Sequence, residues 1–225
     1  MNILSIIPAR SGSIGVKDKN ITVINNLTLI EHAVIHALKY SESADIVVST
    51  DSNLYLNKVK NLLGHSSKLR PKYLSKSSSK ITDVIKYEIN KITEINPKKK
   101  FDLILLLEPS HFSNRKNIPK AIKLMNTKDL DYCIGVASVP EKYNYKKQLV
   151  TSSDRGNISI FNDSMNRQEL APAFIRSGEF YLFKLKNFLK TGQILFGKGE
   201  LLITNEKFVN IDTEEDLMDL KRKFD

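Results

Sequence analysis

Residues 3–20 read Ile3-Leu4-Ser5-Ile6-Ile7-Pro8-Ala9-Arg10-Ser11-Gly12-Ser13-Ile14-Gly15-Val16-Lys17-Asp18-Lys19-Asn20. The first five residues are mostly apolar and predict a short buried β-strand. The loop that follows is rich in serine and glycine and carries cations at Arg10, Lys17 and Lys19. Small residues let backbone amides approach a ligand closely, and amides combined with cations bind phosphate oxygens. The loop is therefore a candidate phosphate site, and a purely structural turn is the alternative interpretation.

Strand and helix patterns alternate from this loop to about residue 139. Apolar stripes predict helices over 27–40, 54–63, 81–92 and 118–125, and apolar runs predict strands over 45–51, 101–107 and 134–139. This order predicts an α/β fold with a Rossmann-like, mostly parallel twisted sheet and helices on both faces. Such sheets bind ligands at the carboxyl ends of their strands, where Arg10, Asp51 and Glu108 are expected. The serine-rich stretch 75–79 predicts either a solvated turn or a lid.

The composition is that of an ordinary globular protein. The chain has 225 residues, of which 41% are hydrophobic and 27% charged, so one domain over 1–225 is expected. No apolar run approaches 18 residues, and the N-terminal apolar stretch is too short for a signal peptide. We therefore expect no membrane partner and a cytoplasmic location. The single cysteine, Cys133, excludes an internal disulfide and lies in an apolar run that predicts packing in the core.

The formal net charge of +10 raises the question of a nucleic-acid partner. The lysines are scattered, however, and the densest run, Lys98-Lys99-Lys100, falls in an expected loop. No helix-turn-helix pattern, zinc pattern or basic stripe with interleaved aromatics is present. We therefore expect no nucleic acid, since anionic small molecules suit the charge equally well. A basic, non-catalytic interaction protein remains an alternative hypothesis.

The 10–20 loop matches neither of two common phosphate motifs, Gly-x4-Gly-Lys-Ser/Thr and Gly-x-Gly-x-x-Gly. It resembles instead the first motif of the CMP-sialic acid synthetases, which are cytidylyltransferases for nine-carbon acidic sugars. That family carries Ala-Arg, Ser-Lys-Gly and Lys-Asn, and this chain has Ala9-Arg10, Ser13-Ile14-Gly15 and Lys19-Asn20. Further resemblances follow in the same order along the chain, at Glu108-Pro109-Ser110, Lys146, Arg167-Gln168, Ser177 to Leu182 and Val209 to Leu217.

The segment Asn210-Ile211-Asp212-Thr213 admits two interpretations from its residues. Asp212 is a good N-cap for the last predicted helix, whose first turn is acidic. Alternation along a strand also places Asn210 and Asp212 on one side, and oxygen ligands of this kind suit Mg²⁺. The sequence therefore predicts either a helix cap or a magnesium site at residue 212.

The resemblance covers the whole chain and implies a nucleotide-diphospho-sugar transferase type of fold. It implies that CTP and a nonulosonic acid (sialic, legionaminic or pseudaminic) react with Mg²⁺ to give the CMP-sugar and pyrophosphate. It also implies that 140–174 is an inserted extended lobe that serves as a dimerisation arm in a homodimer.

The resemblance assigns roles residue by residue. It places the catalytic role on Arg10, Lys19 and Asp212. It implies CTP contacts from Arg10, Ser11, Gly12, Ser13, Lys19, Asn20, Asp51, Arg70 and Glu108. It implies sugar contacts from Lys146, Arg167, Gln168 and Tyr181, and metal ligation by Asp212 and Asn210.

Three residues depart from the family pattern. Ile14 replaces a lysine, Glu108 replaces a glutamine, and Asn210 replaces an aspartate. We therefore expect an enzyme that is weaker or differently selective, or a relative that binds nucleotide without turnover. A cytidylyltransferase for the eight-carbon sugar 3-deoxy-manno-octulosonate is the alternative within the same fold and chemistry.

Overall fold

The computed structural model describes residues 1–13, 15–65, 67–145, 149–151, 158–160, 171–204 and 209–222. Its helices are α1 (Leu29–Ala37), α2 (Asn53–Leu63), α3 (Ile81–Ile95), α4 (Ile118–Thr127), α5 (Leu185–Thr191) and α6 (Glu214–Lys221). The strands of the main sheet are β1 (Ile3–Pro8), β4 (Ile46–Ser49), β5 (Leu103–Leu106), β7 (Tyr132–Ser138), β10 (Phe174–Lys184) and β11 (Gly199–Ile203). Shorter strands are β2 (Val23–Ile24), β3 (Leu27–Thr28), β6 (His111–Phe112), β8 (Leu149–Thr151), β9 (Ile158–Ile160) and β12 (Val209–Asn210).

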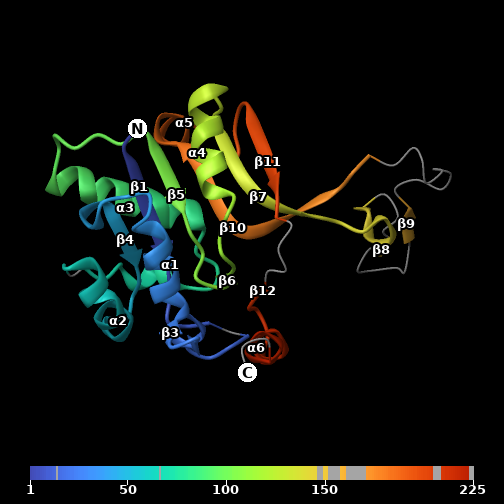
Figure 1. The fold of residues 1–225 in the computed structure, drawn as a ribbon, viewed down its shortest axis with the longest axis horizontal. Helices are drawn as coiled ribbons and strands as arrows, with labels where there is room; N and C mark the ends of the chain where they lie inside the picture. Colours follow the sequence, from blue (N-terminus) through green and yellow to red (C-terminus); the bar gives the residue numbers. More distant parts are fainter. Residues whose placement is uncertain are drawn as a thin grey trace.

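The main sheet has the order β11-β7-β10-β5-β1-β4. Strand β10 is antiparallel to both of its neighbours, and the other pairs are parallel. The predicted mostly parallel sheet is therefore confirmed. Figure 1 shows β7 and β10 running together beyond the body of the molecule toward β8 and β9. Because the chain leaves along β7 and returns beside it, β10 enters the sheet in the reverse direction.

Helices cover both faces of the sheet because apolar residues follow one another along its strands. Ile3 and Ile7 of β1 point to the face covered by α1, α2 and α4. Leu4 and Ile6 point to the opposite face, which α3 and α5 cover. Because β1 is buried on both faces of the sheet, none of the side chains of its first five residues faces solvent, and its sequence is a nearly continuous apolar run. Cys133 is fully buried in the first of these layers, as predicted.

The first helix is shorter than its apolar stripe predicts. The prediction of a helix from residue 27 is wrong, because Leu27–Thr28 pair with Val23–Ile24 as a two-stranded ribbon. Helix α1 then begins at Leu29, where the Thr28 hydroxyl and the Glu31 carboxylate form a reciprocal capping box.

A third apolar cluster joins the two ends of the chain. Helix α6 packs on residues of the 10–20 loop and of the segment that follows it, and Figure 1 shows α6 next to the blue N-terminal loop. The cluster consists of Val16, Ile24, Leu29, Ile211, Leu217 and Leu220, with Phe112 against it. This packing carries the 210–213 segment to the carboxyl end of the sheet.

The predicted inserted lobe lies largely outside the described residues. Of 140–174, the structure describes 140–145, the antiparallel pair β8 and β9, and 171–174. Among the helices described here, none has the length and apolar character needed to cross a membrane.

The central strand β5 generates a stability prediction. Leu105 is fully buried between β1 and β10, so Leu105→Ala is expected to lower the free energy of unfolding by about 3 kcal/mol. Urea unfolding followed by circular dichroism measures this loss. The matched control is Leu54→Ala on α2, where Leu54 is 53% exposed and a change within about 0.5 kcal/mol is expected. Equal losses in the two variants would contradict the assignment of β5 to the core.

Candidate functional site

A cavity of about 360 Å³ opens at the carboxyl ends of β1 and β5, within the range of about 300–1,000 Å³ typical of small-molecule sites. Its walls come from segments far apart in the sequence: 8–20, 70–84, 108–110 and Asp212. The lining residues are Pro8, Arg10, Ser13, Gly15, Lys19, Asn20, Arg70, Leu74, Lys76, Ser77, Ser79, Ile81, Val84, Glu108, Pro109, Ser110 and Asp212. The cavity lies at the edge of the sheet where ligands of such folds bind.

Positive charge predominates in this cavity. Its charged lining residues are four cations and two carboxylates, namely Arg10, Lys19, Arg70 and Lys76 against Glu108 and Asp212. Fixed cations inside a concave site attract anions strongly, because the surrounding protein is less polarisable than water. The charge pattern therefore favours a ligand with several negative charges.

Asp51 and Asn20 hold the loop after β1 through hydrogen bonds to Ser11 and Arg10. The backbone N–H and the hydroxyl of Ser11 donate to the two carboxylate oxygens of Asp51 at 2.9 and 3.0 Å. The amide of buried Asn20 donates to the Arg10 carbonyl at 3.1 Å. Asp51 and Ser11 thus bond to each other, and neither they nor Gly12 line the cavity, whereas Arg10, Ser13 and Asn20 do.

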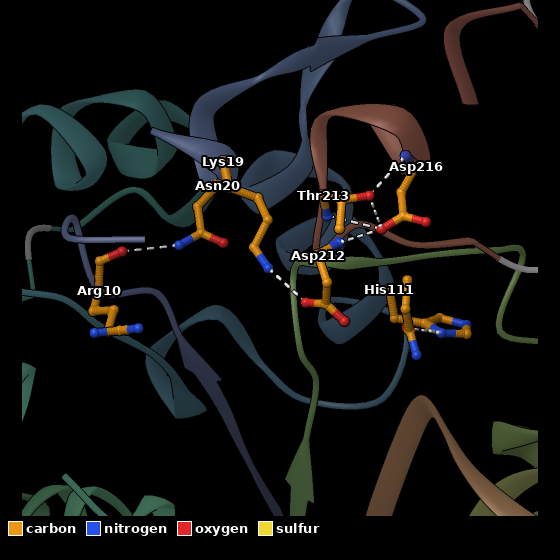
Figure 2. A network of polar contacts seen from close by, with 8 residues as sticks. Arg10, Lys19, Asn20, His111, Asp212, Thr213 and Asp216 are labelled. Atoms are coloured by element: carbon orange, nitrogen blue, oxygen red, sulfur yellow. Dashed lines mark hydrogen bonds and ion pairs between the residues drawn. The ribbon is translucent and has the colours of Figure 1, made fainter. Parts of the chain in front are cut away.

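Lys19 and Asp212 meet across the cavity although 193 residues separate them in the sequence. The Lys19 ammonium lies 3.0 Å from one Asp212 carboxylate oxygen, as Figure 2 shows, and the Asp212 side chain remains 75% exposed. The structure therefore brings Arg10, Lys19 and Asp212 into one cavity.

The cap of α6 is Thr213 and not Asp212. The Thr213 hydroxyl accepts from the Asp216 N–H at 3.2 Å, and the Asp216 carboxylate accepts from the Thr213 N–H at 2.8 Å (Figure 2). The prediction that Asp212 caps the helix is therefore wrong. A neighbouring threonine forms the capping box, which leaves the Asp212 carboxylate available to the cavity.

Asn210 and Asp212 do not share the cavity. Asn210 pairs with His111 between β12 and β6, and its side-chain oxygen lies 3.1 Å from the His111 Nδ1. The same Nδ1 lies 2.7 Å from the Ser177 carbonyl, so it carries the proton and donates to both oxygens. The strand ends at Asn210, so the alternation that suggested a common face does not extend to Asp212.

Glu108 supplies the second carboxylate of the cavity. Burial raises the pKa of the Glu108 carboxyl, Arg115 opposes this shift, and the nearby Asp212 charge adds to it. Two carboxylates in one cavity repel each other unless a cation lies close to both.

Arg70 is buried on the side of the cavity formed by residues 70–84, with only 5% of its surface exposed. Burial lowers the pKa of the Arg70 guanidinium, while Asp51 and Glu88 raise it. Its Nε donates to the Ser75 hydroxyl at 2.9 Å, which ties the serine-rich stretch to this wall. The stretch then supplies Lys76, Ser77 and Ser79 to the cavity. The site prediction omitted these three residues, although the serine run was the signal that could have included them.

Of the predicted sugar-contacting residues, the structure describes Tyr181 alone. Tyr181 is 8% exposed and packs in the apolar layer under α3 and α5, where burial raises the pKa of its hydroxyl to about 12. Lys146, Arg167 and Gln168, like Ile14, lie outside the described residues.

The fold and cavity define an α/β protein with a cationic small-molecule site at the carboxyl end of its sheet. A family model described as Cytidylyltransferase matches residues 4–96, which carry β1, the 10–20 loop and Arg70. The chain is 26% identical over 217 residues to the N-acylneuraminate cytidylyltransferase of Escherichia coli O18:K1:H7, covering 95% of this chain and 49% of that protein. It is 24% identical over 219 residues to the CMP-N,N'-diacetyllegionaminic acid synthase of Legionella pneumophila, covering 96% and 93%.

The chain is therefore related to the cytidylyltransferases, as its motifs predicted. It spans about half the length of the Escherichia coli relative and nearly all of the Legionella one. Its fold is shared with the solved structure of a CMP:2-keto-3-deoxy-manno-octonic acid synthetase complexed with CTP, with a TM-score of 0.67 and 15% identity over 99% of this chain and 98% of that one.

Gly15 generates a prediction about loop packing. A Cβ at Gly15 would lie 1.9 Å from the Asp212 carbonyl oxygen, so Gly15→Ala must displace either the loop or the start of α6. We expect a loss of about 1–3 kcal/mol in the free energy of unfolding, as for other overpacked sites. Gly12→Ala is the matched control, because no atom lies within 4 Å of a Cβ there. Urea unfolding of both variants checks this, and indistinguishable midpoints would contradict the close approach.

The buried imidazole of His111 and the half-buried imidazole of His36 predict a pH-dependent stability. Burial and the nearby Arg115 lower the pKa of His111 to about 4 and that of His36 to about 3. Below pH 6.5 the unfolded chain binds protons that the folded chain does not, so stability falls as the pH falls toward 4. Each imidazole contributes at most about 1.4 kcal/mol per pH unit.

Urea unfolding at several pH values between 7.5 and 4.5, run as a series of about six points, measures the slope. His111→Gln is expected to make the slope shallower than in the unmodified protein. A slope that does not change in this variant would show that His111 is protonated equally in both states.

Proposed function

We propose that this protein is a Mg²⁺-dependent cytidylyltransferase that transfers CMP from CTP to a nonulosonic acid and releases pyrophosphate. The observation that carries the proposal is the meeting of Arg10, Lys19 and Asp212 in one predominantly cationic cavity. The relatives support it, since their names are those of CMP-sugar-forming enzymes for sialic and legionaminic acids.

The reaction joins the anomeric oxygen of the sugar to the α-phosphorus of CTP, breaks the bond from that phosphorus to pyrophosphate, and releases the proton of the sugar hydroxyl to solvent. Phosphoryl transfer of this kind depends mostly on alignment and charge neutralisation. Arg10 and Lys19 would bind the triphosphate oxygens, and the Ser13 region of the loop would bring backbone amides to them. Arg70, with the serine stretch bonded to it, would hold the nucleoside end of the ligand.

The carboxylates of the cavity fit a magnesium ion. Mg²⁺ is commonly held by one or two carboxylates together with substrate phosphates. Asp212 bonds to Lys19 through one oxygen only, and Glu108 lines the same cavity, so we propose that these two would hold the ion. Asn210 accepts from His111 and would support the strand next to the metal rather than bind it. When bound, magnesium would neutralise charge that develops on the leaving pyrophosphate.

Among the described residues, no three His, Cys, Asp or Glu side chains form a group that could hold a metal. The ion is therefore expected to bind together with the nucleotide, whose phosphates would complete its coordination.

The acceptor is proposed to be an acidic nine-carbon sugar. A sugar carboxylate would need cations, which Lys146 and Arg167 supply in the family resemblance, with Gln168 beside them. The buried position of Tyr181 makes it a support of the sheet and not a sugar contact in this proposal. We further propose that the 140–174 lobe forms a homodimer, which light scattering after gel filtration would test. The cytoplasmic location stays a prediction.

The direct test measures pyrophosphate release from CTP and Mg²⁺ with sialic, legionaminic, pseudaminic and 3-deoxy-manno-octulosonic acids offered separately. Release with one of the nine-carbon acids supports the proposal. Preference for the eight-carbon acid would favour the alternative within the same chemistry. CTP binding with no release from any acid would identify a binder without turnover, and steeply salt-dependent nucleic-acid binding without CTP affinity would identify a basic interaction protein.

Substitutions at the ion pair test the proposed roles. Asp212→Asn and Lys19→Gln are each expected to lower kcat about a hundredfold, because each removes one preorganised charge at the transition state. Asp219→Asn on α6 is the matched control, because the 58%-exposed Asp219 side chain pairs with the exposed Arg222 at 3.3 Å and does not line the cavity. Steady-state kinetics with the preferred acid provide the measurement. Full activity in Asp212→Asn would remove Asp212 from the mechanism.

A further inference from the structure

Arg115 is a buried cation that no part of the proposed mechanism uses. It lies between β6 and α4 with a left-handed backbone (φ 49°) and is 2% exposed. Burial lowers the pKa of its guanidinium to about 10, so the group is still charged at neutral pH. A buried charge is stable only where hydrogen bonds and an opposite charge compensate for its lost hydration.

The guanidinium donates to three main-chain carbonyls, two in the 108–111 turn and one in β10. It reaches the Glu108 carbonyl at 2.7 Å and the His111 carbonyl at 2.9 Å, and it also donates to the Glu179 carbonyl of β10. Glu108 and His111 bracket Pro109 and Ser110, so Arg115 holds both ends of the cavity-lining turn from outside.

The 108–111 turn, which Arg115 holds, is hydrogen-bonded to the segment that leads to Asp212. The Ile211 N–H donates to the Ser110 carbonyl at 3.0 Å, and Asn210 pairs with His111 in the β12–β6 ladder. A displacement of the 108–111 turn would therefore displace the segment that ends in Asp212. Arg115 itself is not among the residues that line the cavity.

Glu179 is the counter-charge of this arrangement. It is 1% exposed, and its carboxylate accepts from the Asn117 backbone at 3.1 Å, the Asn117 amide at 3.0 Å and the Thr204 hydroxyl at 2.6 Å. The preceding Gly178 has φ +78°, and a Cβ there would lie 3.0 Å from the Asn210 side-chain oxygen and 3.4 Å from the Glu108 carboxylate. The β10 backbone therefore lies directly behind the acidic side of the cavity.

We propose that Arg115, with Glu179 as its counter-charge, is the positioning residue for the acidic wall of the site. It places the carboxylates of Glu108 and Asp212 relative to the cationic wall formed by Arg10 and Lys19. The cationic wall has supports of its own, since Asp51 and Asn20 hold its loop, and it meets the acidic wall where Lys19 and Gly15 contact Asp212. The catalytic consequence rests on the proposed function, whereas the positioning itself can be measured without any substrate.

The experiment compares the full-length protein with Arg115→Lys, Arg115→Met and Ile118→Ala. Lysine keeps the charge but has fewer donors in a different geometry, and methionine removes both. Ile118 is fully buried at the start of α4, so its truncation is a control for destabilisation that leaves the Arg115 hydrogen bonds intact. Circular dichroism gives the folded fraction of each variant, and Arg115→Lys carries the test if Arg115→Met does not fold.

Hydrogen–deuterium exchange gives the readout that is independent of function. In Arg115→Lys, peptides covering 108–112 and 209–213 are expected to exchange at least about tenfold faster, since local opening removes their shared hydrogen bonds. Peptides covering β1 and 16–24 are expected to keep their rates. Unchanged exchange at 108–112 and 209–213, or acceleration throughout the protein as in Ile118→Ala, would overturn the proposal.

Binding and kinetics test the catalytic consequence. CTP binding in EDTA is expected to stay within about twofold, because the cationic wall is intact, whereas Mn²⁺ affinity in the CTP complex should fall about 10–100-fold. With an accepted sugar, kcat should fall while KM for CTP is retained. Parallel loss of metal-free CTP binding and Mn²⁺ affinity would overturn the separate positioning of the two walls. Failure of the unmodified protein to bind CTP would overturn the proposed function and leave the exchange result as the test of Arg115.

Discussion

The site depends on the packing of the last helix against the segment that follows the first strand. Apolar side chains from both ends of the chain, such as Val16 and Leu217, form one small buried cluster. This burial brings Asp212 within 3.0 Å of Lys19, an exposed ion pair that would contribute little by itself. Burial of the apolar cluster therefore supplies most of the free energy that holds α6 in place, and the Lys19–Asp212 ion pair adds little to it. Gly15 permits the close approach, because any side chain there would collide with the Asp212 carbonyl.

The cavity has two walls of opposite character, and each wall has its own support. The cationic wall is a loop whose backbone is bonded by Asp51 and Asn20, two residues predicted to touch the ligand. The acidic wall is a turn whose carbonyls are bonded by Arg115. In both cases a buried polar group satisfies main-chain atoms that secondary structure leaves unpaired. Asp51, Asn20 and Arg115 thus position the loop and the turn that carry the charged side chains.

The structure shows where two of the residues that depart from the family motifs, Asn210 and Glu108, lie relative to the cavity. The Asn210 side chain bonds to His111 and is not among the residues that line the cavity. Glu108 adds a carboxylate inside the cavity, where its charge lies close to that of Asp212. The cavity therefore holds two carboxylates, one from the turn that follows β5 and one from the residue before the cap of α6. Thr213 takes over the capping of α6 and leaves Asp212 exposed to the ligand side.

The sequence by itself determined the alternating order of strands and helices, the mostly parallel sheet and the relation to cytidylyltransferases. These follow from local periodicity and from motifs whose residues are adjacent, such as Ala9-Arg10 and Lys19-Asn20. Only the tertiary structure decided which predicted residues reach the cavity. Asp51, Ser11 and Asn210 find partners elsewhere, because their hydrogen bonds join segments distant in sequence. Arg115 could not be identified from the sequence for the same reason, because its three acceptor carbonyls come from segments that only the folded sheet brings together.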